Sequence, residues 1–204
     1  MNRIISVAIS ILITSGVLFP FSVNGIPIFN TKMFMAVLGI IVYLFSVSRE
    51  RKAAIPKKFT NLTIYSAIFS IICLFSVIYN DTPDYAYATY IVSMWVWLGA
   101  AYFACHCIKR LCGELSLKTV TFILMYVCVF QCIMALAIDN IGFVKNIVDS
   151  FVDQGQEFFT RANRLYGIGA SLDVAGTRFA AVLLLIGNIL STNTHSLKKW
   201  DVPI

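Results

Sequence analysis

The chain has 204 residues, of which 59% are hydrophobic and 13% are charged, and it carries a formal net charge of +6. Soluble domains are about 25% charged and about 45–50% apolar, so this composition excludes an ordinary soluble domain. The apolar residues also come in long runs, and roughly 20 apolar helical residues are needed to cross about 30 Å of hydrocarbon. We therefore predict an all-α, polytopic integral membrane protein.

Six apolar runs predict about six transmembrane helices. The first run resembles a signal peptide, but Ser15, Gly16, Phe19 and Pro20 do not form a small-residue cleavage site, so we interpret it as a retained helix. The runs cover residues 4–23, 32–48, 62–79, 87–107, 119–138 and 177–190. The chain then divides into five helices over 1–138, an outer (periplasmic) loop over 139–176, and a sixth helix with a tail over 177–204.

The basic residues predict the orientation of these helices, because short cytoplasmic loops carry an excess of Lys and Arg. With both termini in the cytoplasm, most of the basic residues fall inside: Arg3, Arg49, Arg51, Lys52, Lys57, Lys58, Lys109, Arg110, Lys118, Lys198 and Lys199. The outer side keeps Lys32, Lys145, Arg161, Arg164 and Arg178, together with most of the acidic residues. We interpret the net positive charge as topology and contact with anionic membrane lipids, and not as binding of nucleic acid.

The cysteines and histidines do not predict a metal or redox site. Cys105 and Cys107 lie about 200° apart around a helix, whereas zinc sites favour two to four residues between paired cysteines. His106 and His195 both fall near cytoplasmic ends of predicted helices. We expect no cofactor and no metal.

The first half of the outer loop predicts an amphipathic helix. Its apolar residues recur in pairs at i, i+4 and i+8, namely Phe143 with Val144, Ile147 with Val148, and Phe151 with Val152. Such a pattern is typical of a helix in the membrane interface, with its apolar face toward lipid or toward the helix bundle. The polar face is acidic, which favours an architectural lid over a sensor of anionic lipid. Gly155 is the expected end of this helix.

The second half of the outer loop gathers arginines and glycines in the segment RANRLYGIGASLDVAGTRFA, residues 161–180. Arginine binds phosphate through two parallel hydrogen bonds, and free helix-terminal amides also favour anions. Glycine lets the backbone turn sharply or approach another group closely. The residues of this candidate anion site are Arg161, Arg164, Arg178, Gly167 and Gly169.

Two further interpretations concern the same segment. Ser171 or Asp173 is expected to cap the sixth helix by accepting hydrogen bonds from its first amides. The alternative to an anion site is that the arginines pair with Asp153, Glu157 and Asp173 at the interface, or extend toward water. Arg178 at the start of a helix favours the anion site, because the helix dipole disfavours a cation there.

The segment RLYGIG at residues 164–169, followed by Asp173 and small residues that lead into a helix, resembles the family of O-antigen ligases and O-antigen polymerases. The resemblance implies a multi-pass protein of the bacterial inner (cytoplasmic) membrane that joins lipid-linked glycans at its outer face during surface polysaccharide biosynthesis. It also implies that Arg164 holds the diphosphate of an undecaprenyl-linked sugar donor. Arg161 and Arg178 are further candidate diphosphate ligands because of the chemistry of arginine, and not because of the resemblance. Members of that family are considerably longer, so this chain resembles their N-terminal half and is expected to need a partner for activity.

A glycosyltransferase of this kind would use the arginines to neutralise the leaving diphosphate, and Asp173 is the nearest carboxylate for a catalytic base. The expected partners are a lipid-linked oligosaccharide, membrane lipids, and a second half or other membrane proteins of polysaccharide assembly. Two alternatives stay open: a transporter or flippase fragment for a phosphorylated or lipid-linked solute, and a non-catalytic membrane scaffold. The middles of all six predicted helices lack charge, which weakens the transporter alternative.

Overall fold

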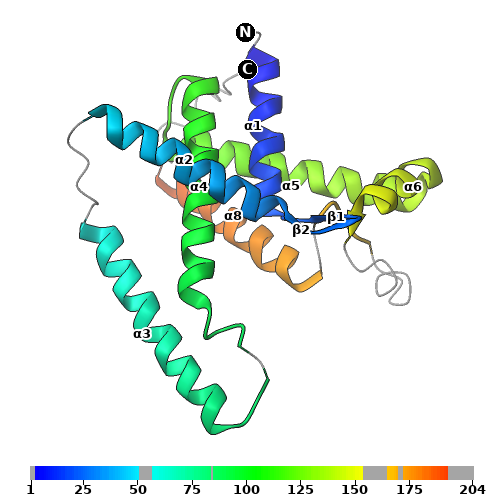
Figure 1. The fold of residues 1–204 in the computed structure, drawn as a ribbon. Coiled ribbons are helices and arrows are strands. Elements are labelled where there is room, and N and C mark those ends of the chain that lie inside the picture. The colour runs from blue at the N-terminus through cyan, green and yellow to red at the C-terminus, as the bar shows by residue number, and fades with distance from the viewer. Residues whose placement is uncertain (1–2, 51–56, 84, 154–164, 170–171, 193–204) are drawn as a thin grey trace. The chain divides into compact units, whose positions relative to one another are not determined.

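The computed structural model describes residues 3–50, 57–83, 85–153, 165–169 and 172–192, and helices dominate this part of the chain (Figure 1). The elements follow in the order α1 (Arg3–Leu18), β1 (Ser22–Val23), β2 (Ile26–Asn30), α2 (Thr31–Glu50), α3 (Lys57–Tyr79), α4 (Tyr90–Cys112), α5 (Leu117–Asn140), α6 (Gly142–Phe151), β3 (Val152–Asp153) and α8 (Leu172–Thr192). Each of the six apolar runs lies largely within a helix, which confirms the helical fold class.

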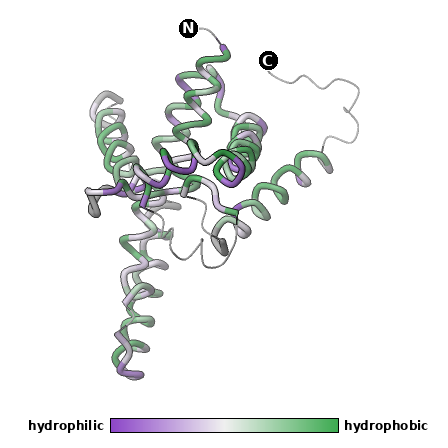
Figure 2. The backbone as a smooth tube through the Cα atoms, turned by 90° about the vertical axis from the view of Figure 1, so that its right-hand side faces the viewer, coloured by the Kyte–Doolittle hydropathy of each residue, from purple (hydrophilic) through white to green (hydrophobic). Residues whose placement is uncertain are grey.

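Three helical segments are long and apolar enough to cross a membrane: Thr60–Tyr79, Tyr90–Cys112 and Leu117–Asn140. Shorter apolar helices cover Arg3–Leu18, Thr31–Ser46 and Ala175–Ser191. Figure 2 shows that hydrophobic residues occupy much of the length of these helices. The structure therefore supports a membrane protein, while the number of six spans and the cytoplasmic placement of both termini stay predictions.

Helix α1 is shorter than the sequence indicated. The last helical hydrogen bond joins the Phe19 amide to the Ser15 carbonyl at 2.7 Å, and the next residue is Pro20. Proline has no amide hydrogen and disfavours a helical conformation in the residue before it, so the helix ends at Leu18. Of the residues expected to complete the span, Ser22 and Val23 form strand β1 instead.

A small antiparallel sheet with the strand order β2-β1-β3 follows α1. Ser22 pairs with Asn30 in β2 on one side and with Asp153 in β3 on the other. The connection after α1 therefore lies beside the segment that follows α6, so both must be on the same side of a membrane that the helices cross. The predicted orientation also places both segments on one side.

The C-terminus of α6 is capped from this sheet. The last carbonyl groups of a helix lack partners within the helix. Asn24 provides hydrogen-bond donors to these carbonyls. Its side-chain amide donates to the carbonyls of Asp149 at 2.9 Å and Ser150 at 3.3 Å, and its backbone amide donates to the Phe151 carbonyl at 3.0 Å. Helix α6 consequently ends at Phe151, four residues before the expected stop at Gly155, and Val152 belongs to β3.

The described chain forms two compact units, residues Met1–Lys32 with Ala104–Ile204, and residues Met33–Phe103. The first unit has two apolar clusters. One joins α1, α4 and α5 and is extended by α8, and the other joins α5 and α6 to Tyr166. Their fully or nearly buried members are Phe19, Ile108, Ile123 and Val127 in the first cluster, and Ile138, Val148, Val152 and Tyr166 in the second.

The second unit is held together by small and hydroxyl-bearing residues. Gly39 and Gly99 bring α2 and α4 into backbone contact, because a Cβ atom added to Gly39 would collide with the Gly99 carbonyl. Helix α3 contacts α4 through two buried serines. The Ser66 hydroxyl donates to Met94 Sδ at 2.8 Å, and the Ser70 hydroxyl accepts from the Ile91 amide at 2.9 Å.

Several polar side chains lie inward in both units, and many large apolar ones lie outward. The buried polar residues are Ser6, Ser10, Thr14, Ser15, Ser66, Ser70, Thr121 and Gln131. Outward-facing apolar residues include Ile72 and Phe75, which are 61% and 70% exposed. Contacts between membrane helices are enriched in small and hydroxyl-bearing residues, whereas a soluble protein rarely exposes large continuous apolar surfaces.

We predict that Gly39→Ala destabilises the second unit by about 1–3 kcal/mol, the usual cost of inserting a methylene where there is no space. The new methyl group forces α2 and α4 apart at Gly99. Thermal unfolding of the detergent-solubilised chain, followed by circular dichroism, measures the change. The matched control is Gly187→Ala in α8, where nothing lies within 4 Å of the added Cβ. An equal shift in both variants would contradict the close helix contact.

Candidate functional site

The structure describes only some of the predicted site residues. Arg161 and Arg164 lie outside the described residues. Asp173 is the second residue of α8, and its side chain is also outside them. Gly167, Gly169 and Arg178 are described, and they show how the second half of the loop joins the helices.

Gly169 has to be a glycine. Its backbone φ is +69°, a left-handed conformation that other residues rarely adopt. An added Cβ would also lie 2.9 Å from both the Phe19 carbonyl carbon and the Pro20 carbonyl oxygen. The turn therefore rests directly on the backbone that follows α1, and Gly167 beside it is buried.

Gln131 holds the same turn from α5. Its side-chain nitrogen donates to the Ile168 carbonyl and to the Ser15 hydroxyl, both at 3.0 Å, and the residue is only 2% exposed. One buried amide thus joins α1, α5 and the Arg/Gly segment. The sequence offered a weak signal for this role, a single amide within an otherwise apolar helix.

Tyr166 fixes the segment to α6. Its hydroxyl donates to an Asp149 carboxylate oxygen at 2.9 Å, and its ring belongs to the buried cluster with Ile138 and Val148. Burial raises the pKa of Tyr166 to about 12, and the hydrogen bond to Asp149 and the charge of Asp149 add to the effect. The phenol is therefore neutral at physiological pH.

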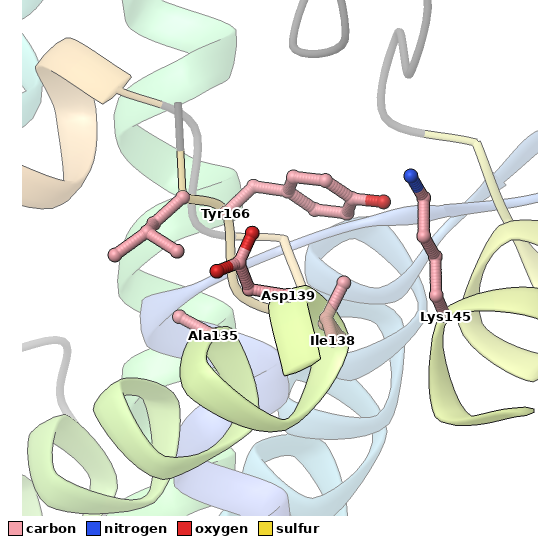
Figure 3. Close-up of a pocket in the computed structure, with 6 residues that line it drawn as sticks. Ala135, Ile138, Asp139, Lys145 and Tyr166 are labelled. Atoms are coloured by element: carbon pink, nitrogen blue, oxygen red, sulfur yellow. The ribbon is translucent and has the colours of Figure 1, made fainter. Parts of the chain in front are cut away.

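A small pocket lies where this segment meets α5 and α6. Figure 3 shows Asp139 and Lys145 on either side of the Tyr166 side chain, with Ala135 and Ile138 below. The pocket volume is about 40 Å³. A buried water needs roughly 10–15 Å³ of such volume, so the pocket holds a few water molecules but not a sugar diphosphate.

Arg178 lies farther into its helix than the sequence indicated. Helix α8 begins at Leu172 instead of Thr177, so Arg178 is in the second turn. The helix dipole acts mainly within the first turn, so it has less influence on this arginine than we expected. The guanidinium carbon is instead 5.6 Å from the centroid of the buried Phe19 ring, which is a favourable cation–π distance.

The structure adds Lys32 to the predicted arginines. Lys32 lies in the first turn of α2, both it and Arg178 are half-buried, and the two charges are close enough to repel each other. Two neighbouring cations present several hydrogen-bond donors and two positive charges to one ligand. Such a pair suits an anion with more than one charged oxygen.

Within the described residues, no group of three or more His, Cys, Asp or Glu side chains could hold a metal ion. The described residues beside the turn anchored by Gln131 and Gly169 include the cation Arg178, which lies over the Phe19 ring.

Comparison of the chain with models of known protein families, with curated proteins and with solved structures gives no significant match.

We predict that Tyr166→Phe lowers the free energy of unfolding by about 1.5–3 kcal/mol below pH 10, the usual contribution of a hydrogen bond to a charged group. Folding raises the pKa of this phenol. The contribution of its hydrogen bond to the free energy of unfolding is therefore complete below the ordinary tyrosine pKa near 10 and is lost as the pH approaches 12. Unfolding at pH 8 and pH 12 measures the difference between the two proteins. A difference that stays constant or grows with pH contradicts the bond to Asp149.

Proposed function

We propose that this chain binds the diphosphate of an undecaprenyl-linked glycan at the membrane surface, as part of a polymerase or ligase of surface polysaccharides. The observation that carries the proposal is the half-buried Arg178, whose guanidinium carbon lies 5.6 Å from the centroid of the Phe19 ring, with the half-buried cation Lys32 as its electrostatic neighbour. A diphosphate matches the pair because it brings several charged oxygens, and guanidinium groups bind phosphate oxygens strongly.

The anchored turn supports the proposal in a second way. Gly169 rests on the backbone of Phe19, and the Phe19 ring lies under Arg178. The segment that carries Arg164 in sequence is thus joined at Leu165–Gly169 to the same part of the first unit as Arg178. Arg164 and Arg161 would complete the anion site, as the family resemblance implies for Arg164.

The proposed chemistry is electrostatic. As the bond between the sugar C1 atom and the diphosphate breaks, negative charge grows on the leaving oxygen, and fixed cations stabilise it. Asp173, in the first turn of α8, is the proposed base for the acceptor hydroxyl. This inner-membrane enzyme would act together with a second half or another membrane protein of polysaccharide assembly.

One observation favours the alternative of a transporter or flippase for the same kind of lipid-linked solute. Three buried oxygen atoms of the first unit have no hydrogen-bond partner among the residues that the structure describes: Thr14 Oγ1, Thr121 Oγ1 and Gln131 Oε1. Buried polar groups without partners are costly, and in transporters such groups face a polar path. Net movement of a lipid-linked solute across sealed vesicles, without glycan transfer, would favour this alternative.

We predict that Arg178→Ala and Lys32→Ala each weaken binding of undecaprenyl diphosphate at least about tenfold, which corresponds to ~1.4 kcal/mol. Equilibrium binding of the radiolabelled lipid to the full chain in nanodiscs measures the affinity, with undecaprenol as the uncharged comparison. Lys145→Ala is the matched control, since this cation lines the small pocket instead, and it should change the affinity less than about twofold. Unchanged affinity in both folded variants, or equal binding of undecaprenol, contradicts the proposal.

A further inference from the structure

Helix α6 carries two apolar stripes instead of one. Val144 and Val148 pack against the cluster of Ile138 and Tyr166, and Val148 is 6% exposed. The neighbouring stripe points outward, with Phe143 and Phe151 exposed by 74% and 65%. Ile147, between them on the same stripe, is also exposed. The sequence predicted one apolar face, directed toward lipid or toward the helix bundle. In the structure, one half of this face is buried and the other half is exposed.

The stripes have fixed directions on the helix. At 3.6 residues per turn, the stripe of Phe143, Ile147 and Phe151 lies about 80° around the axis from Val144 and Val148. The polar residues Lys145, Asn146 and Asp149 occupy the remaining arc. A helix with this arrangement meets three environments at once: the protein core, a second apolar medium and water.

The position of α6 in the chain identifies the second medium. Helix α6 begins two residues after the end of α5, which is long and apolar enough to cross a membrane. Exposed apolar side chains occur on both sides of this junction, at Ile133 and Leu136 in α5 and at Ile141 and Phe143 after it, with the polar Asp139 and Asn140 between them. The uncovered stripe thus begins close to the exposed apolar side chains of a helix that could cross a membrane.

Contacts near the C-terminus of α6 prevent the helix from turning this stripe inward. Asn24 holds the carbonyls of its last turn, and the Asp149 carboxylate accepts the hydroxyl hydrogen of Tyr166. Rotation about the helix axis would break both contacts and expose Val148. The polar arc carries both a cation, Lys145, and an anion, Asp149, so apolar contact and not attraction to anionic headgroups would hold the helix in place.

We propose that Phe143, Ile147 and Phe151 insert into the membrane interface at the end of α5, and that α6 thereby fixes the Tyr166 turn at the depth of the lipid headgroups. The occupant of the uncovered stripe is the boundary between phospholipid headgroups and acyl chains. This inference concerns where the chain touches lipid and does not depend on the proposed glycan chemistry.

The test places photoreactive p-benzoylphenylalanine at Phe143, Phe151 or, as the matched control, Asn146 in the full chain. The chain is reconstituted in vesicles of phosphatidylethanolamine and phosphatidylglycerol, illuminated, and analysed by mass spectrometry for lipid adducts. The exposed aromatic residues are replaced by a larger aromatic one, so the fold is retained, which thermal unfolding verifies. We expect phospholipid adducts at positions 143 and 151 that exceed those at 146 at least about fivefold and persist in high salt.

If something other than lipid covers the stripe of Phe143, Ile147 and Phe151, the cross-linked products differ. A cross-link between two copies of the chain at positions 143 and 151 would assign the stripe to an interface between copies and overturn the proposal. Absence of lipid adducts at 143 and 151, or yields equal to those at 146, would show that water covers the stripe. Adducts that disappear in high salt would contradict insertion by apolar contact.

Discussion

Small and hydroxyl-bearing side chains make many of the helix contacts in the described part of this chain, and many of its large apolar side chains face outward. Gly39 meets Gly99, and the serines of α3 face α4. Each apolar side chain left outward would cost about 25 cal/mol per Å² of surface in water, and lipid removes that cost. The arrangement of the helices therefore depends on an apolar solvent around them.

The same constraint explains how the Arg/Gly segment is held. In an apolar surrounding, a buried polar group needs a partner inside the protein. Gln131 meets this need for Ile168, and Asn24 meets it for the end of α6. Gly169 permits the close approach to Phe19 that brings the turn beneath Arg178. The proposed diphosphate site is thus supported by hydrogen bonds that bridge elements distant in sequence, while Lys32 and Arg178 supply its charge.

The helices were predictable because length and hydropathy alone define an apolar run, and α6 was predictable because its pattern has the helical period. The sheet was not, since β1 and β3 have only two residues each, which leaves no periodic signal, and β1 pairs with β3 from a remote segment. Pro20 was the available sign that α1 ends early. Lys32 was predicted on the same side as Arg178, but their closeness depends on how α1, α5 and α8 pack, which a single sequence does not reveal.

The most direct test of the lipid-facing arrangement is the labelling of α3 by a carbene reagent dissolved in the hydrocarbon of the membrane. The full chain in vesicles is labelled, digested and analysed by mass spectrometry. The account predicts modification at the outward-facing residues Ile68, Ile72 and Phe75, and protection at Ser66 and Ser70, which face α4. Protection of Ile72 and Phe75, or their equal modification by a water-soluble reagent, would contradict it.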